Sequence, residues 1–315
     1  KQPPRAFCGL GLTIIPTSTN TAFAAMGLPV GAAGQEFIPL FQVDDGFCTV
    51  GDWQRPDPAK FPDGMGAVAE RIRAAGFLPG LWMAPFVCAE SSQLHAQHPD
   101  WILRDESGAE VRTGSHWGGA VALDTRNAQV RNHVCESVRT AVRDWGFGLL
   151  KLDFLYAACM LPHDGLNRGQ LMADALALLR EAAGESCLLL GCGVPLASAF
   201  GVVDYCRIGC DVGLDWDDKP PMRLLHRERV STKNSLGDTI ARAPLDGRAF
   251  GNDPDVFFLR DDVKLSARQR QQLLDADARF GSMLLTSDDM GEWGTAKREQ
   301  FQAALHTLLE RKSRG

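Results

Sequence analysis

The sequence predicts a single-domain α/β protein with the architecture of a (β/α)8 TIM barrel. Eight short apolar runs alternate with longer stretches in which apolar residues recur every three or four positions. This alternation is typical of parallel strands joined by helices. The chain has 315 residues, a length that is normal for one barrel with insertions. It shows no Gly-x-Gly-x-x-Gly after the first run and no Gly-x-x-x-x-Gly-Lys-Ser/Thr, which disfavours an open nucleotide-binding sheet.

The eight apolar runs are the expected strands. They cover residues 6–12, 37–43, 77–85, 147–154, 187–192, 205–208, 248–250 and 282–285. We assign residues 1–36 to an atypical first βα segment, because the stretch before Glu36 is rich in Ala, Gly and Thr and lacks a charged helical pattern. Residues 37–315 then form the remainder of the barrel.

Five stretches carry the spacing of amphipathic helices. They cover residues 64–75, 128–144, 167–183, 266–279 and, as a closing helix, 295–309. The first of them has clear end signals, since Asp63 is a suitable N-cap and Gly76 a suitable C′ residue.

Composition excludes several kinds of partner. The net charge of −6 and the pI near 5.7 argue against a nucleic acid. No apolar stretch approaches the ~18 residues that a membrane span needs, and no signal peptide is visible. Nine cysteines without framework spacing are expected to be free thiols in a reducing compartment, so we predict a cytoplasmic protein. Whether the chain forms a homo-oligomer stays open.

Carboxylates follow several of the expected strands. Asp44 and Asp45 close the second run, Asp153 the fourth, Asp211 follows the sixth, and 288–289 follow the eighth. Active sites of TIM barrels lie at the carboxyl ends of the strands. The sequence therefore predicts one acidic pocket there.

Two carboxylates on either side of a pocket can hydrolyse a glycosidic bond. Lys151 and Asp153 are two residues apart on one strand, so their side chains point to the same face. A neighbouring lysine would hold Asp153 ionised, which suits a nucleophile. Asp211, which follows Arg207 in Arg-Ile-Gly-Cys-Asp, is the acid candidate, although a helix cap or an ion pair would explain it as well.

Other residues at the same strand ends allow more than one interpretation. Asp44 and Asp45 suit two sugar hydroxyls, a divalent cation or a simple turn. Trp82 can stack on a sugar or fill the core, and Trp53 can wall the pocket. The oxygen-rich stretch 252–255, Asn-Asp-Pro-Asp, is the main rival signal because such loops bind Mg²⁺ or Ca²⁺.

Together these segments resemble the catalytic barrel of glycoside hydrolase family 36, the α-galactosidase and α-N-acetylgalactosaminidase clan. The matching motifs, in the family's order, are Val43-Asp44-Asp45-Gly46-Phe47, Gly51-Asp52-Trp53, Phe61-Pro62-Asp63-Gly64-Met65, Gly80-Leu81-Trp82-Met83-Ala84-Pro85-Phe86, Lys151-Leu152-Asp153-Phe154, Arg207-Ile208-Gly209-Cys210-Asp211 and Asn252-Asp253-Pro254-Asp255. One departure is the first strand, where the family usually has a Gly-Trp-x-Ser-Trp-like segment and this chain does not.

The resemblance implies a retaining mechanism with Asp153 as nucleophile and Asp211 as general acid/base. It also implies that Asp44 and Asp45 bind the hydroxyls at C4 and C6 of galactose. The remaining residues of the implied substrate subsite are Trp82, Lys151, Cys192 and Arg207. No metal or organic cofactor is implied.

The expected function is that of an exo-α-galactosidase, which releases terminal α-galactose from oligosaccharides or glycoconjugates. Its partner is therefore an α-galactoside or a related oligosaccharide. An α-N-acetylgalactosaminidase or another α-glycosidase of the clan is the close alternative. A catalytically impaired sugar-binding barrel is a second, prompted by the atypical segment 10–36, and a metal-dependent phosphoryl or aldol barrel is a third.

Overall fold

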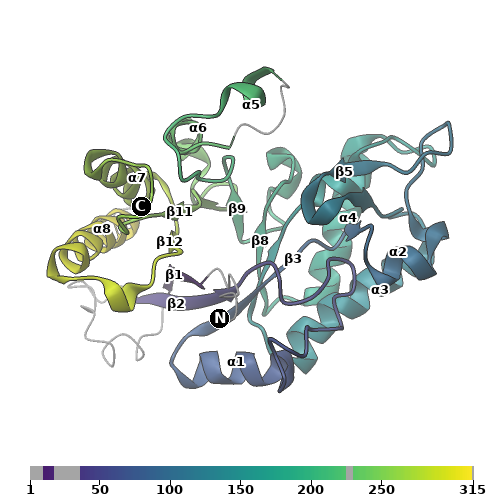
Figure 1. The fold of residues 1–315 in the computed structure, drawn as a ribbon, viewed down its shortest axis with the longest axis horizontal. Helices are drawn as coiled ribbons and strands as arrows, with labels where there is room; N and C mark the ends of the chain where they lie inside the picture. Colours follow the sequence, from purple (N-terminus) through teal and green to yellow (C-terminus); the bar gives the residue numbers. More distant parts are fainter. Residues whose placement is uncertain (1–9, 18–35, 225–229, 314–315) are drawn as a thin grey trace, which may run out of the picture. The chain divides into compact units, whose positions relative to one another are not determined.

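A computed structural model of the protein describes residues 10–17, 36–224 and 230–313 (Figure 1). Its strands and helices form an α/β fold, as the sequence predicts. The chain divides into two compact units, each described by itself. The first unit contains Val43–Ala74 and Pro79–Asp204. The second contains the described residues of Leu10–Gln42, Ala75–Leu78 and Tyr205–Gly315.

Three parallel strands form the centre of the first unit. They are β3 (Leu78–Met83), β7 (Leu149–Leu152) and β8 (Leu188–Gly191). β7 pairs with β3 on one side and β8 on the other, with Lys151 opposite both Trp82 and Leu190. Most side chains of these strands are buried, which is typical of parallel strands covered on both faces.

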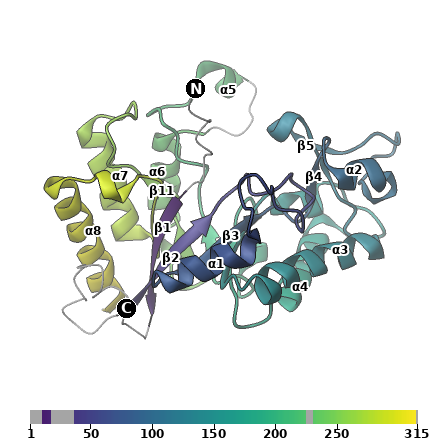
Figure 2. The same ribbon diagram turned by 60° about the horizontal axis from the view of Figure 1, so that its bottom comes forward.

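The three helices predicted in the first unit begin and end close to the predicted positions, and a further short helix at residues 93–97 was not predicted. They are α1 (Gly64–Ala74), α2 (Gln93–Gln97), α3 (Ala128–Arg139) and α4 (Arg168–Ala183), with the short turns η2 (Pro99–Trp101), η3 (His116–Gly118), η4 (Thr140–Asp144), η5 (Leu155–Cys159) and η6 (Leu196–Ala199). α3 and α4 lie side by side (Figures 1 and 2). A capping box between Asn167 and Gln170 opens α4, because each side chain accepts a hydrogen bond from the other residue's backbone amide.

A small antiparallel sheet between β3 and α3 was not predicted. It consists of β4 (Val87–Ala89), β5 (Arg112–Gly114) and β6 (Ala120–Ala122), in the order β4-β6-β5. Strands of three residues are too short for a periodic signal in the sequence. The tight turn between β5 and β6 carries Trp117.

Second-unit strands include the ones that end at Arg207 and Asp253. They are β1 (Leu10–Thr17), β2 (Glu36–Val43), β9 (Tyr205–Arg207), β10 (Gly251–Asp253), β11 (Val256–Phe257) and β12 (Leu284–Thr286). β9 pairs in parallel with β10, and β11 with β12. β1 runs antiparallel to β12, whereas all strands of the predicted barrel are parallel.

The helices of the second unit are α5 (Pro220–Leu224), α6 (Thr232–Ala241), α7 (Ala267–Phe280) and α8 (Thr295–Ser313), with the turns η7 (Ala243–Leu245) and η8 (Met290–Glu292). Two of them, α7 and α8, pack against an aromatic core. Phe257, Trp293 and Phe301 are buried together, with ring centroids 5.5 to 6.3 Å apart. In the part of the chain that the structure describes, no helix is both long and apolar enough to cross a membrane.

Most predicted elements are confirmed, and the strand predicted at 248–250 is wrong. Backbone amides of Arg248 and Ala249 donate to the carbonyl of Leu245, so this stretch is a turn and β10 begins after it. The predicted strand 6–12 lies partly outside the described residues, since only its last three residues fall in β1. Residues 18–35 of the atypical first segment also lie outside them.

Candidate active site

The first unit brings one predicted carboxylate to the end of its central strand. Asp153 follows β7 directly and is half-buried. Its backbone amide donates to the carbonyl of Met83, which continues the pairing with β3 by one residue. The alternation of the strand places Lys151 on the same face, as predicted.

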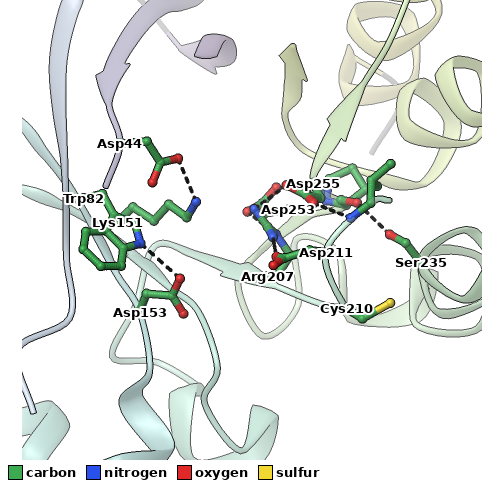
Figure 3. Close-up of polar contacts among 12 residues, drawn as sticks. Asp44, Trp82, Lys151, Asp153, Arg207, Cys210, Asp211, Ser235, Asp253 and Asp255 are labelled. Carbon is green, nitrogen blue, oxygen red and sulfur yellow. Dashed lines mark hydrogen bonds and ion pairs between the residues drawn. The ribbon is translucent and has the colours of Figure 1, made fainter. Parts of the chain in front are cut away.

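Neutral N–H groups hold both oxygens of the Asp153 carboxylate. The indole Nε1 of Trp82 donates to Oδ2 at 3.0 Å (Figure 3), and the backbone amide of Phe154 donates to Oδ1 at 2.7 Å. Phe154 has a φ of +52°, a left-handed conformation that is strained for a bulky side chain. Such strain is common at functional sites, where it is part of how a reacting group is presented.

Lys151 forms an ion pair with Asp44. The ammonium Nζ lies 3.1 Å from Oδ2, and the lysine side chain is 12% exposed. The sequence predicts that Lys151 acts on Asp153. The structure adds a partner 107 positions away in the chain, which ties the turn after β2 to β7.

Asp45 is held by Trp117, a residue that was not predicted from the sequence. The indole Nε1 of Trp117 donates to Oδ2 of Asp45 at 2.7 Å. The indoles of Trp82 and Trp117 lie 6.0 Å apart, and those of Trp53 and Trp82 lie 5.9 Å apart. Three indoles therefore lie near the acidic residues. The sequence signal for Trp117 was an aromatic residue in a glycine-rich stretch.

Cys192 and Trp53 are both buried. Cys192 follows β8 directly, is buried, and accepts a backbone hydrogen bond from Leu155 at 3.4 Å. Trp53 is 1% exposed and packs against Phe47 and Trp82. Trp53 therefore supports the indole that contacts Asp153.

In the second unit, one arginine binds three carboxylates (Figure 3). Arg207 ends β9, and its side chain is 3% exposed. Its guanidinium contacts Oδ1 of Asp211 at 2.9 Å, Oδ2 of Asp253 at 2.9 Å and Oδ1 of Asp255 at 2.7 Å. We call these four residues the Arg207 cluster. Asp211 is its exposed member, with 61% of its side chain accessible, whereas Asp253 is completely buried.

The stretch 252–255 has a structural use within this cluster. The remaining oxygens of its carboxylates accept backbone hydrogen bonds, from Val212 to Asp255 at 2.6 Å and from Asp255 to Asp253 at 2.9 Å. Among the described residues, no group of three or more His, Cys, Asp or Glu side chains is arranged to hold a metal ion. The oxygen-rich composition of this stretch is thus explained by its arginine partner.

The charges of the Arg207 cluster act on a further acid, Asp277 of α7. It is 1% exposed, and its carboxyl oxygens have no hydrogen-bond partner in the described part of the chain. Burial raises the pKa of Asp277 well above 3.8, and the negative charges of Asp255 and Asp253 raise it further. Both effects disfavour the charged form of this carboxyl group.

The acid expected after the eighth strand does not serve the predicted pocket. Asp288 is 4% exposed, and its Oδ2 accepts from the backbone amides of Leu259 and Arg260 and from the indole of Trp293, at 2.7 to 3.1 Å. It fixes a loop of the second unit. Of the predicted residues, Asp44, Asp45, Trp82, Lys151, Asp153 and Cys192 lie in the first unit, and Arg207 and Asp211 lie in the second.

Comparison with known proteins gives consistent matches. A family model described as Melibiase matches residues 33–165. Alpha-galactosidase 2 of Pediococcus pentosaceus is 31% identical over 129 residues, covering 38% of this chain and 17% of that enzyme.

Solved structures extend the match. TtGalA, an α-galactosidase from Thermus thermophilus solved in complex with stachyose, has a TM-score of 0.78 and 35% identity, covering 90% of this chain and 60% of that chain. The GH36 α-galactosidase AgaA of Geobacillus stearothermophilus has a TM-score of 0.55 at 14% identity, covering 85% of this chain and 37% of that one. This second structure shows the fold alone.

The α/β fold, the strand-end carboxylates and these matches relate the chain to the glycoside hydrolases. Residues 33–165 match the Melibiase family model, and the resemblance to the α-galactosidases of family 36 is confirmed. The match covers 17% of the Pediococcus enzyme and 60% of the Thermus chain. The chain therefore corresponds to part of its relatives' length.

Proposed function

We propose that this chain is the (β/α)8 catalytic barrel of a retaining exo-α-galactosidase, with Asp153 as nucleophile and Asp211 as general acid/base. The observation that carries the proposal is the hold on Asp153, whose two oxygens each accept a hydrogen bond from an N–H donor at the end of β7. A carboxylate fixed in this way is oriented for attack without being covered by a counter-charge. The Thermus relative, solved with stachyose and with p-nitrophenyl α-D-galactopyranoside, supports an α-galactoside as substrate.

Two displacement steps account for retention. In the first, an Asp153 oxygen forms a bond to the anomeric carbon while the glycosidic C–O bond breaks, and the Asp211 carboxyl gives its proton to the leaving oxygen. In the second, Asp211 takes a proton from a water molecule, whose oxygen displaces Asp153 from the anomeric carbon. The product is α-galactose, and both carboxyl groups return to their starting states.

Polar residues of the first unit suit the sugar hydroxyls. Asp44 and Lys151 form a charged pair that offers both an acceptor and a donor. Charged acceptors make stronger hydrogen bonds to hydroxyls than neutral ones do. We propose that Asp44 and Asp45 bind the hydroxyls at C4 and C6, and that Trp82, Lys151, Cys192 and Arg207 complete the subsite.

Substitution of the nucleophile tests the proposal. Asp153→Ala should reduce hydrolysis of 4-nitrophenyl α-galactoside by about 10³-fold or more, since it removes the group that forms the covalent intermediate. Azide should restore part of the activity and give the β-galactosyl azide, identified by NMR. Asp100→Ala, at an exposed position of η2, is the matched control and should retain activity.

Three other results would contradict the proposed function or favour an alternative to it. Unchanged activity in Asp153→Ala would overturn the role of Asp153. A wild-type chain that cleaves only the α-N-acetylgalactosaminide would identify the close alternative. A chain that binds galactose without turning over any aryl glycoside would be the sugar-binding barrel.

A further inference from the structure

The turn between β5 and β6 is built to fix Trp117 in place. Trp117 has a φ of +56°, and it lies among Gly114, Gly118 and Gly119, all with positive φ. A left-handed conformation is rare for a bulky residue and costs on the order of 1 kcal/mol. A strained residue at the tip of a surface turn needs a reason, and its contacts supply one.

Neighbouring contacts hold this turn against the rest of the first unit. The carbonyl of Gly119 accepts from the amide of Glu90 at 3.0 Å, and a Cβ at Gly119 would lie 2.7 Å from the Glu90 carboxyl group. Glu90 also pairs with Arg112 of β5 at 2.5 Å. The hydroxyl of Tyr156 donates to the carbonyl of Thr113 at 2.9 Å. The position of Trp117 is therefore determined by packing on both sides.

Two aromatic contacts connect Trp117 to the nucleophile. Its ring lies 6.0 Å from Trp82, which donates to Asp153, and 5.1 Å from Phe154, whose amide also donates to Asp153. The indole Nε1 of Trp117 itself donates to Asp45. Trp117 thus contacts Asp45 directly and also packs against both residues that donate to Asp153.

We propose that Trp117 is a positioning residue that orients Asp45 for one hydroxyl of the sugar, and so contributes to selectivity for galactose. This inference rests on the proposed function. Indole N–H groups only donate and carry no charge, so Trp117 occupies one oxygen of Asp45 and leaves its negative charge intact. In this proposal, the other oxygen, Oδ1, accepts the hydrogen bond from the sugar hydroxyl. Because Asp45 is exposed, binding would otherwise have to pay the cost of ordering its side chain.

The variant Trp117→Phe separates this role from packing, because it keeps an aromatic ring and removes the N–H donor. We measure kcat and KM for 4-nitrophenyl α-galactoside and for its 4-deoxy and 6-deoxy analogues, with the full chain. The variant should lose about tenfold in kcat/KM on the galactoside, mainly through KM, since hydrogen bonds to charged groups are worth about that factor. On the deoxy analogue that lacks the hydroxyl bound by Asp45, kcat/KM of the variant should differ from that of the wild type by less than about twofold.

Two further variants control the result. Trp101→Phe removes an indole N–H that donates to Gln129, outside the proposed subsite, and should leave all three substrates unchanged. Asp45→Asn combined with Trp117→Phe should be no worse than Asp45→Asn alone, because the two residues act through one contact. The melting temperature of each variant shows whether it folds.

Each outcome bears on one statement. If kcat/KM of Trp117→Phe falls equally on all three substrates, or on none, the assignment of Trp117 is overturned. The proposed function stands in that case as long as the wild type is active. Additive losses in the double variant also overturn it. A folded wild type that is inactive on all three substrates overturns the proposed function, and the assignment of Trp117 falls with it.

Discussion

The two proposed catalytic carboxylates are held in opposite ways. Asp153, in the first unit, is half-buried and accepts from two neutral N–H donors. Asp211, in the second unit, is 61% exposed and contacts an arginine that is 3% exposed. Neutral donors fix orientation and leave the charge of Asp153 in place, whereas the guanidinium belongs to a buried network.

This difference suggests separate roles: the donors around Asp153 orient its carboxylate, whereas the Arg207 cluster stabilises the fold. In the Arg207 cluster, one positive charge serves three carboxylates, so the formal charge is +1 − 3 = −2 when all are ionised. Two of those carboxylates are buried and depend on Arg207. Changes in the cluster should therefore act mainly on stability, and changes around Asp153 mainly on the rate of the reaction.

The largest expected effect is on stability, from Arg207→Met. It leaves the buried carboxylates of Asp253 and Asp255 without their cation, which typically costs about 3–5 kcal/mol. Urea unfolding at neutral pH measures the loss. Lys264→Met, which removes an exposed ion pair with Asp215, is the control and should cost less than about 1 kcal/mol. Equal costs for the two variants would show that the cluster does not stabilise the fold.

The next effect concerns Asp277, whose pKa is raised above 3.8 by burial and by the cluster's negative charges. A carboxyl group with a raised pKa contributes stability that is fully present below pH 3.8 and is lost as the pH rises through the folded value. Asparagine cannot ionise. The free energy of unfolding of Asp277→Asn should therefore rise relative to that of the wild type by about 1.4 kcal/mol for each pH unit between pH 3.8 and the folded-state pKa.

Urea unfolding at several pH values between 3.5 and 8 measures this difference. Asp275→Asn, two positions earlier on α7 and only partly buried, is the matched control and should follow the wild type. A difference between Asp277→Asn and the wild type that does not change with pH would contradict the raised pKa of Asp277.

Much of the placement of the site could be predicted, because it depends on where strands end. Asp153, Cys192 and Arg207 lie at or just beyond the ends of β7, β8 and β9, as their apolar runs indicated. The same-side placement of Lys151 and Asp153 follows from the two-residue period of a strand.

Partners far apart in the chain could not be predicted in this way. Lys151 meets Asp44 across 107 positions, Trp117 meets Asp45 across 72, and Arg207 meets Asp253 across 46. No local pattern encodes such pairs. The composition of the stretch 252–255 suits a metal ion and a guanidinium equally well. Only the position of β9, which brings Arg207 to this stretch, distinguishes the two.

The smallest expected effect tests the other side of the comparison. Trp82→Phe keeps a ring against Trp53 and removes the donor to Oδ2 of Asp153. We expect kcat on 4-nitrophenyl α-galactoside to fall about tenfold, or about 1.4 kcal/mol, with KM within about twofold. The free energy of unfolding should change by less than about 1 kcal/mol, because the side chain stays apolar and packed.

Comparison with Trp101→Phe separates loss of this donor from a general effect of replacing an indole. If Trp82→Phe instead destabilises the chain by several kcal/mol and keeps its kcat, then Trp82 is a core residue and its hydrogen bond does not orient the nucleophile. A fall in kcat with unchanged stability has the opposite meaning. Because Phe can still stack on a sugar, such a fall would identify the N–H group, rather than the ring, as the part of Trp82 that acts on Asp153.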